Sequence, residues 1–262
     1  MNDELTNRVV VVAGASAGLG FAVARECAKQ KARVMMFARN ADRLVQAASD
    51  IGNLATPIAC DITNPDSVRS AFDQIAEEAG HIDVLVNVAA IARIRLLSDA
   101  SDEDIESIVR TNLFGPIYCI RSAVPLMRST SNPQIINVSS EISLGYMPGM
   151  TLYSCSKAGL DDLSRCLVNE LAPEGIRICN FVSGKILGTD FVSNFELNEL
   201  EHARRGWLES GYSHYVAGDG VEVEAMAGAM MSVIMSSPEV LFDVYHARSS
   251  GRSQLTRNGD AT

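Results

Sequence analysis

Residues 8–24 read RVVVVAGASAGLGFAVA, an apolar run that passes through a glycine-rich turn into a second apolar stretch. The apolar run predicts a buried strand, and the stretch from residue 18 onward has the period of a helix. Gly14, Gly18 and Gly20 lie between the two. Glycines at such a turn let a pyrophosphate approach the backbone and the helix N-terminus, whose unpaired N–H groups favour an anion. The stretch therefore indicates a nucleotide-binding turn, although a glycine-rich turn is a weak signal when it stands alone.

Strand-like and helix-like segments alternate along the rest of the chain. Alternation of this kind is typical of a parallel sheet covered by helices on both faces. We therefore expect a single α/β domain built on a doubly wound sheet of about seven strands. The predicted strands are residues 8–14, 32–39, 54–61, 82–90, 133–140, 176–184 and 239–247, and the predicted helices include 18–31, 64–79, 101–127 and 151–172.

Polar residues mark where several of these helices begin. Asn40, Asn64 and Ser101 each stand directly before a helical pattern, and asparagine and serine are preferred N-caps. Pro116 and Pro125 fall inside the longest predicted helix, which should therefore start late, kink or end early.

The regular pattern ends near residue 247. We expect the domain to span residues 1–247, with 189–220 as an irregular insertion that acts as a substrate lid. Residues 248–262 are polar and are predicted to form a disordered tail.

Composition excludes several classes of function. The chain has 262 residues and a formal net charge of −10, whereas binding to nucleic acid normally needs a basic face. No apolar run is long enough for a membrane span, and the N-terminus lacks the basic start of a signal peptide, so we expect a cytoplasmic protein. The six cysteines form no CxxC pair and the four histidines are scattered, which argues against disulfides and a metal site.

The stretch TLYSCSKAGL, residues 151–160, places Tyr153 and Lys157 four positions apart. On a helix these side chains share a face. They can be surface residues of an ordinary helix, or they can form a phenol whose pKa is lowered by a neighbouring ammonium.

The glycine spacing GxxxGxG is the form typical of the classical short-chain dehydrogenase/reductase (SDR) family, and the chain resembles that family over residues 5 to about 247. The resemblance implies a Rossmann fold and a nicotinamide cofactor. It also matches the family's catalytic tetrad at Asn112, Ser140, Tyr153 and Lys157. Ser139 is the neighbouring alternative to Ser140.

The resemblance implies a role for each member of the tetrad. Tyr153 is the acid or base, and Lys157 lowers the Tyr153 pKa and holds the nicotinamide ribose. Ser140 polarises the carbonyl, and Asn112 anchors a water chain for protons.

Position 39 bears on the choice of cofactor. An NAD-binding site usually presents an acidic residue at the end of the second strand, but this chain has Ala38, Arg39 and Asn40. Arginine can pair with a 2′-phosphate, so NADP(H) is favoured over NAD(H), unless Arg39 merely starts a surface loop. The predicted cofactor-binding residues are Gly14, Ser16, Gly18, Leu19, Gly20, Arg39, Asn40, Asp61, Ile62, Asn87, Ala89, Tyr153, Lys157, Gly184, Ile186 and Thr189.

Two turns depart from the family pattern. The Asn-Asn-Ala-Gly turn of the family reads NVAA at residues 87–90, and its Pro-Gly turn reads SGKILGTD from Ser183 onward. Thr189, which would touch the carboxamide, stands one position late. We expect a slightly altered nicotinamide pocket.

Aromatic and methionine side chains gather around the expected substrate site. The predicted pocket consists of Ser140, Tyr146, Met147, Tyr153, Phe191, Phe195 and Trp207. These aromatics either cover a bulky apolar substrate or pack against the body or a second subunit. Arg93 and Arg95, near the expected rim, either bind an anionic group of the substrate or are solvated charges.

The sequence therefore predicts an NADP(H)-dependent oxidoreductase that interconverts a ketone and a secondary alcohol on a hydrophobic small molecule. One alternative is a reductase of 3-oxoacyl thioesters. Another is a non-catalytic, nucleotide-sensing Rossmann protein, which the complete tetrad disfavours but the altered turns leave open. Because relatives commonly pair through their long helices, we also expect a homodimer or homotetramer.

Overall fold

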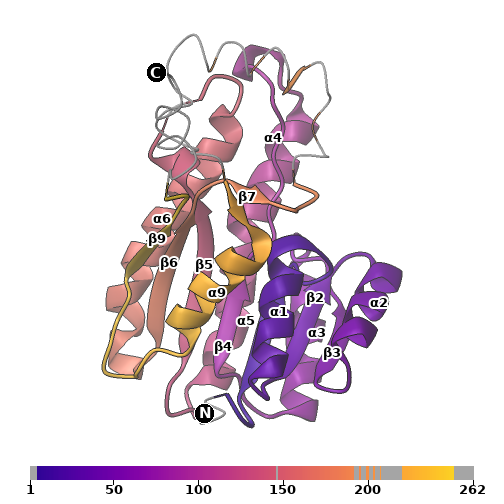
Figure 1. Ribbon diagram of the computed structural model, residues 1–262, viewed down its shortest axis with the longest axis vertical. Helices are drawn as coiled ribbons and strands as arrows, with labels where there is room; N and C mark the ends of the chain where they lie inside the picture. The colour runs from indigo at the N-terminus through magenta and orange to yellow at the C-terminus, as the bar shows by residue number, and fades with distance from the viewer. Residues whose placement is uncertain are drawn as a thin grey trace, which may run out of the picture.

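The computed structural model describes residues 5–145, 147–191, 195, 199–200, 203, 207 and 220–250. Its centre is a seven-stranded sheet with the order β3-β2-β1-β4-β5-β6-β9, and every neighbouring pair is parallel (Figure 1). The strands are β1 Val9–Ala13, β2 Arg33–Ala38, β3 Ala55–Ala59, β4 Val84–Asn87, β5 Gln134–Ser140, β6 Arg177–Ser183 and β9 Val244–Ala247. The predicted doubly wound sheet is confirmed.

Helices cover both faces of this sheet. On one face α1 (Gly18–Lys29), α2 (Ala41–Ile51) and α9 (Val223–Ile234) pack on the strands, and α1 lies beside α9 (Figure 1). On the other face α3 (Pro65–Glu78), α5 (Gly115–Met127) and α6 (Thr151–Leu171) form a second apolar layer. Successive valines of β1 enter the two layers alternately, because side chains of a strand point to opposite faces. This explains why the central strands read as unbroken apolar runs.

The predicted caps are present. Asn40 accepts a hydrogen bond from the Arg43 N–H, and Asn64 accepts from the N–H groups of Asp66 and Ser67. Ser101 and Asp104 form a reciprocal capping box at the start of α4, Asp102–Val109. These side chains satisfy N–H groups that have no partner within the helix.

The longest predicted helix is interrupted as expected, but not at a proline. A π-helical segment, Arg110–Phe114, separates α4 from α5. Pro116 lies in the first turn of α5, where its missing N–H costs nothing, and Pro125 lies near the end of that helix. The π-helical turn contains Asn112, and such turns frequently occur at functional sites.

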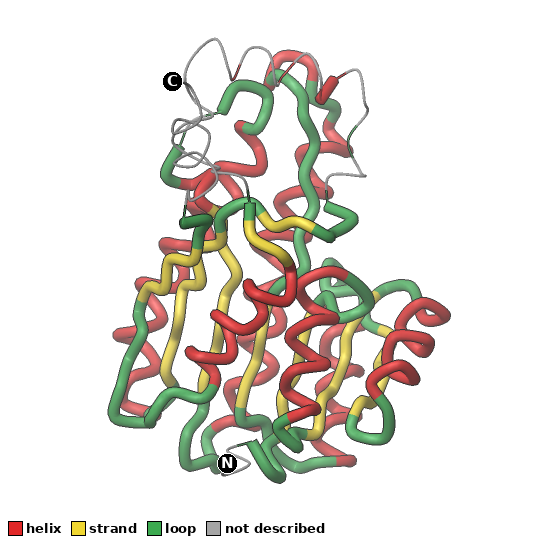
Figure 2. Tube along the Cα trace, in the orientation of Figure 1, coloured by secondary structure: helices red, strands yellow, loops and turns green. Residues whose placement is uncertain are grey.

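Short elements complete the described chain. Residues Leu97–Asp99, Glu141–Ser143 and Ala172–Glu174 form 3₁₀ turns. A separate pair, β7 (Ile186–Leu187) and β8 (Val221–Glu222), lies beyond the carboxyl ends of the main strands (Figure 2). Only Val244–Ala247 of the predicted last strand is a strand. The described helices include none long and apolar enough to cross a membrane.

Candidate active site

A cavity of about 1160 Å³ opens at the carboxyl ends of the central strands. Ligands of open α/β sheets bind at this edge, because the loops that leave adjacent strands converge there. The glycine turn after β1, the loop after β2 and the segment after β4 line one part of the cavity. The end of β5, the first turns of α6 and the segment after β6 line the other. The structure thus brings most of the predicted site residues into one space.

The glycine turn is shaped by very close backbone contacts. Gly14 has a φ of +100°, and a Cβ on it would lie 2.8 Å from Cα of Ala89. A Cβ on Gly20 would lie 2.1 Å from the carbonyl oxygen of Gly14. Only glycine fits at these two positions. The altered NVAA turn therefore still packs tightly against the glycine turn, through Ala89.

The N-terminus of α1 remains available for an anion. Its N-cap, Ala17, makes no side-chain cap, and its first turn carries no acidic residue. Gly18, which opens the helix, is close to Thr189, since a Cβ on Gly18 would lie 3.4 Å from the threonine Cβ. The residues present fit a dinucleotide, because the turn supplies free N–H groups and open backbone where a pyrophosphate lies.

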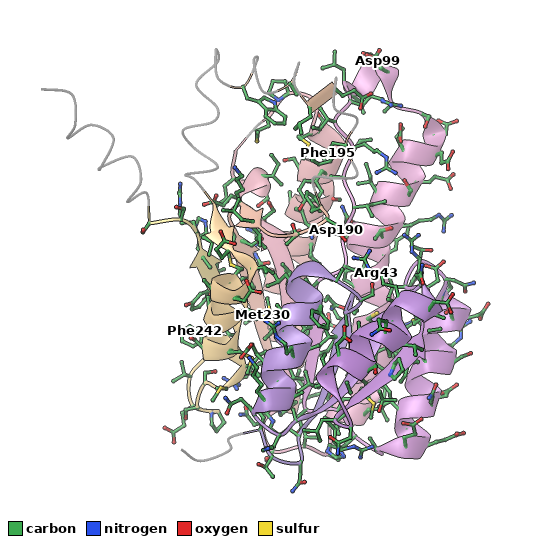
Figure 3. All side chains as sticks on the ribbon, turned by 45° about the vertical axis from the view of Figure 1, so that its right-hand side comes forward. Arg43, Asp99, Asp190, Phe195, Met230 and Phe242 are labelled. Atoms are coloured by element: carbon green, nitrogen blue, oxygen red, sulfur yellow. The ribbon has the colours of Figure 1, made fainter. Side chains whose placement is uncertain are left out.

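Two arginines stand at the end of the cavity where the adenosine ribose would bind. Arg39 lines the cavity and is exposed. Arg43, in the first turn of α2, also lines it and is ion-paired with Asp190 (Figure 3). The Asn40 side chain is engaged as the α2 cap, whereas Ser16 lines the cavity.

The reacting centre is formed by α6 against the end of β5. Tyr153 and Ser140 are hydrogen-bonded through their side chains, and both line the cavity. Lys157, one turn along α6, is fully buried and donates a 2.7 Å hydrogen bond to the carbonyl oxygen of Val138. Ser139 also lines the cavity, but its Oγ has no partner among the described residues. The geometry therefore favours Ser140 over Ser139.

Burial dominates the ionisation of the tyrosine–lysine pair. It raises the pKa of Tyr153 to about 12, while the hydrogen bond with Ser140 acts in the opposite direction. It lowers the pKa of Lys157 to about 8, opposed by the charge of Asp161. Burial thus places the Tyr153 pKa above its ordinary value, and the Lys157 ammonium lies 5.8 Å from the ring centroid, so a lowering of this pKa by Lys157 stays a prediction.

Asn112 is placed behind the reacting centre. Its Oδ1 accepts from the Ile91 N–H at 2.9 Å, and its Nδ2 donates to the Ile91 carbonyl at 2.8 Å and to Ser156 Oγ at 3.0 Å. Ser156 in turn donates to the Tyr153 carbonyl at 2.7 Å. Asn112 is not among the residues that line the cavity. It connects the segment after β4 to the second turn of α6.

Apolar side chains form the outer part of the cavity. Phe191 lies against the Tyr153 ring with centroids 5.5 Å apart, and Phe195 lies 5.7 Å from Phe191. Met147 and Trp207 join the same cluster, and both line the cavity. Tyr146, which we also predicted here, is outside the described residues. The described part of this wall suits a hydrophobic substrate.

Arg93 and Arg95, which we predicted near the rim, are not among the residues that line the cavity, and both have acidic partners. Arg95 forms 3.1 Å ion pairs with Asp104 and with Glu199, and Arg93 lies 3.9 Å from Asp104. Each of these arginines has a carboxylate nearby, and Arg95 is ion-paired with two carboxylates.

Comparison with known proteins identifies the family. The family model described as short chain dehydrogenase matches residues 8–200. The chain belongs to the short chain dehydrogenase family. It is also 36% identical over 193 residues to the 3-oxoacyl-[acyl-carrier-protein] reductase of Bos taurus, an alignment that covers 74% of this chain and 80% of the relative.

Solved structures agree with this assignment. A short-chain type dehydrogenase/reductase from Mycobacterium marinum matches with a TM-score of 0.82 at 27% identity, over 95% of this chain and 97% of the other. A serine dehydrogenase complexed with NADP+ matches with a TM-score of 0.79 at 25% identity, over 91% of this chain and 94% of the other.

Two predicted cofactor residues of this short chain dehydrogenase do not line the cavity. Asp61 Oδ1 accepts hydrogen bonds from the N–H and the hydroxyl of Thr63, so it shapes the turn after β3. Asn87 is buried in the sheet and donates to Asn137 Oδ1 at 2.9 Å. Cys60, Ile62 and Thr63 line the cavity beside Asp61 instead. The remaining predicted cofactor residues all line it.

Several lining residues were missed from the sequence. Ile142 belongs to the apolar cluster around Tyr153, and an apolar residue in a loop carries no distinctive signal. Arg43 was missed because it appeared to be an ordinary helix residue, although it follows Arg39 by only four positions. Glu141 was missed although it directly follows Ser140, and its charge next to a reacting serine was the available signal.

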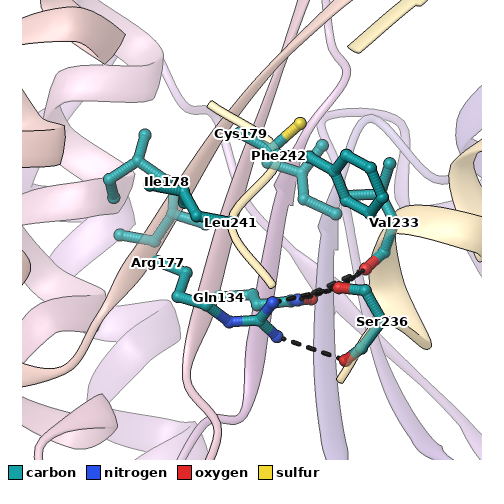
Figure 4. A pocket seen from close by; sticks show the side chains of 10 residues that line it. Gln134, Arg177, Ile178, Cys179, Val233, Ser236, Leu241 and Phe242 are labelled. Carbon is teal, nitrogen blue, oxygen red and sulfur yellow. Dashed lines mark hydrogen bonds between the residues drawn. The ribbon is translucent and has the colours of Figure 1, made fainter. Parts of the chain in front are cut away.

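A second cavity, of about 10 Å³, lies at the amino end of β6 (Figure 4). It has room for about one water molecule. Arg177 donates there to Ser236 Oγ at 3.0 Å and to Asn132 Oδ1 at 2.6 Å, while Gln134 donates to the Val233 carbonyl at 3.3 Å. The hydrogen bond to Ser236 fastens the segment between α9 and β9. Within the described residues no cluster of histidine, cysteine and acidic side chains could hold a metal ion.

Proposed function

We propose that the protein is an NADP(H)-dependent oxidoreductase that interconverts a ketone and a secondary alcohol on a hydrophobic small molecule. The observation that carries the proposal is the hydrogen-bonded pair of Tyr153 and Ser140, with Lys157 one turn behind, in the same cavity as an open glycine turn. Membership of the short chain dehydrogenase family supports the redox chemistry.

In the reduction direction the neutral phenol is the functional form. When bound, a reduced nicotinamide supplies a hydride to the carbonyl carbon. Negative charge then grows on the carbonyl oxygen, and the Tyr153 hydroxyl donates its proton to that oxygen while the Ser140 hydroxyl orients it. With a pKa raised to about 12, Tyr153 carries this proton at neutral pH.

Lys157 and Asn112 support the tyrosine in different ways. Most Lys157 side chains are cationic at neutral pH, since the pKa is about 8. A cation beside the ring stabilises the phenolate that the reaction leaves behind, and its own proton can pass onward to restore the phenol. Asn112 acts on Tyr153 through Ser156, so we assign it a positioning role in addition to the predicted anchoring of water.

A preference for NADP(H) is supported by Arg39 and Arg43, the two guanidinium groups at the ribose end of the cavity. Guanidinium groups bind phosphate through paired, charge-assisted hydrogen bonds. The serine dehydrogenase with the same fold was solved as a complex with NADP+. Arg43 extends the predicted set of phosphate ligands.

A reductase of 3-oxoacyl thioesters is the second candidate, favoured by the name of the bovine relative. Such a substrate on an acidic carrier protein would need a basic rim. Arg93 and Arg95 are the basic residues expected there, and Asp104 and Glu199 compensate their charge. This ion pairing favours a free small molecule over a carrier-bound acyl chain.

Oxidation of NADPH, followed by its absorbance, tests the proposal. The panel should contain aliphatic, cyclic and aromatic ketones together with 3-oxoacyl thioesters, and the reverse reaction should be run on the alcohols with NADP+. We expect turnover of hydrophobic ketones. Turnover of thioesters alone would establish the second candidate, and NADPH binding without turnover of any compound would establish a nucleotide sensor.

Subunit pairing is proposed on similar grounds. Phe114 is partly exposed on the helical segment between α4 and α5, and its ring lies 6.3 Å from that of Tyr118. An exposed aromatic pair on a long helix favours a homodimer or homotetramer, which sedimentation analysis distinguishes from a monomer.

A further inference from the structure

Glu141 is a buried carboxylate directly after the reacting serine. Only 3% of the residue is exposed, and it lines the large cavity. Its Oε1 lies 2.8 Å from His246 Nε2 and 3.1 Å from Arg248 Nε. Because an ionised carboxylate only accepts hydrogen bonds, His246 Nε2 donates to Oε1, and Arg248 adds an ion pair to the same oxygen.

The second oxygen of this carboxylate has no partner. Glu141 Oε2 is buried and makes no hydrogen bond with any described residue. It faces Gly184, since a Cβ on Gly184 would lie 3.0 Å from it. Gly184 also lines the cavity, at the point where the chain leaves β6. An unpaired buried acceptor costs about 1–3 kcal/mol, and charged groups cost more, so such an atom needs an explanation.

Charge balance restricts what can satisfy Oε2. The Arg248 guanidinium already compensates the negative charge of Glu141. A second cation is therefore not required, whereas an N–H or O–H donor is. Only glycine leaves the flank of Oε2 uncrowded, because a Cβ at position 184 would lie 3.0 Å from Oε2 and 3.1 Å from Arg248 Cβ.

We propose that Glu141 Oε2 accepts a hydrogen bond from a neutral N–H or O–H donor of a molecule bound in the cavity, so that Glu141 determines specificity. The donor is the carboxamide of the nicotinamide or a hydroxyl of the substrate near its carbonyl. The inference rests on the proposed function, because it takes the cavity to hold both molecules. Gly184 and Ile186, the residues predicted to lie along the nicotinamide, adjoin the same wall.

Glu141→Gln is the decisive variant because it preserves shape and reverses polarity. Arg248 can only donate, so the glutamine amide oxygen must take the position of Oε1. The amide NH₂ then replaces Oε2. Because this NH₂ is itself a donor, it cannot accept the hydrogen bond from the bound molecule. Glu239→Gln is the matched control, because Glu239 is exposed, lines no part of the cavity and carries the same single charge.

The first arm measures cofactor binding without turnover. Titration calorimetry compares NADP+ with its 3-acetylpyridine analogue, in which a methyl group replaces the carboxamide NH₂. If the carboxamide is the donor, wild type and Glu239→Gln bind NADP+ about tenfold more tightly than the analogue. Glu141→Gln then loses this preference.

The second arm measures the binding of alcohols to the complex of the protein with NADP+. It compares a hydrophobic 1,2-diol with the monoalcohol that has a methyl group in place of the second hydroxyl. If the substrate hydroxyl is the donor, wild type favours the diol about tenfold and Glu141→Gln loses that preference.

Either preference, lost in Glu141→Gln and kept in Glu239→Gln, supports the proposal and names the donor. The proposal is overturned if the wild type shows no preference in either arm, and this outcome does not depend on whether the variants fold. It is also overturned if Glu141→Gln keeps the preference of the wild type. Because both arms are binding measurements, a protein that reduces no ketone would refute the proposed function without deciding the role of Glu141.

Discussion

Arg43 in the first turn of α2 is ion-paired with Asp190, 147 residues later in the chain. Both residues line the large cavity, so the pair spans the place where the adenosine end of the cofactor would enter. A 2′-phosphate would compete with Asp190 for the guanidinium. We therefore expect cofactor binding to be coupled to the segment that carries Phe191.

Replacing Asp190 by asparagine should tighten NADPH binding a few-fold. The substitution releases Arg43 from this ion pair and removes a negative charge next to the expected phosphate. Both side chains are more than half exposed, so the ion pair itself adds about 0–1 kcal/mol to stability and unfolding should hardly change.

Arg43→Ala is the matched comparison, because it breaks the same ion pair. We expect it to weaken NADPH binding, measured by fluorescence titration. If both variants shift affinity in the same direction, the ion pair is structural and Arg43 does not contact the cofactor.

Arg39→Ala should weaken NADPH binding about tenfold or more and NADH binding only slightly, since a charge-assisted phosphate contact contributes about 1.5–3 kcal/mol. Arg33→Ala is the control, because Arg33 is exposed at the opposite end of β2. Equal losses for the two cofactors would show that Arg39 does not select NADPH.

Tyr153→Phe should abolish turnover and leave NADPH affinity within a few-fold. The phenylalanine ring keeps the contact with Phe191 but has no proton to donate. Steady-state rates and cofactor titration on the same preparation check both statements, and substantial residual turnover would remove Tyr153 from the acid–base role.

Two serine variants provide an internal control for that experiment. Ser140→Ala removes the hydrogen-bonding partner of Tyr153 and should lower kcat about a hundredfold or more. Ser139→Ala removes a hydroxyl without a described partner, so the loss should be much smaller.

Lys157 should make stability rise with pH. The folded protein loses the lysine proton near pH 8, whereas the unfolded chain keeps it to about 10.5, its ordinary value. Between these values the unfolded chain binds more protons, so the free energy of unfolding increases with pH, by about 3 kcal/mol across the window.

Urea unfolding of wild type and Lys157→Met at several pH values isolates this contribution. The stability of the wild type relative to the variant should increase from pH 8 to pH 10.5. Titration of Tyr153 affects both proteins and cancels in the difference. Parallel curves would show that Lys157 keeps an ordinary pKa.

Local patterns predicted the fold well. Helix caps and glycine turns depend on residues only a few positions apart, so they can be recognised in the sequence. This holds for the caps at Asn40, Asn64 and Ser101 and for the glycine turn. The apolar runs predicted the strands of the sheet, because a sheet that is buried on both faces has strands that are apolar along their whole length.

The site was predictable to the extent that it follows a family pattern. The pairing of Tyr153 with Ser140 was anticipated, but the balance of charge and desolvation at Tyr153 depends on how deeply the fold buries it. Glu141 with His246, and Arg43 with Asp190, are contacts between distant segments that only the folded chain defines.

The edge strand β9 is fastened at both ends by side chains of the central strands and their loops. Arg177 holds the segment before it through the Val240 carbonyl, and Glu141 holds His246 near its carboxyl end. A nascent chain whose synthesis stops before β9 would thus already contain Tyr153 and Ser140, yet leave Glu141 without its cationic neighbour. The wall of the reaction chamber around Glu141 is consequently complete only when the last strand has docked.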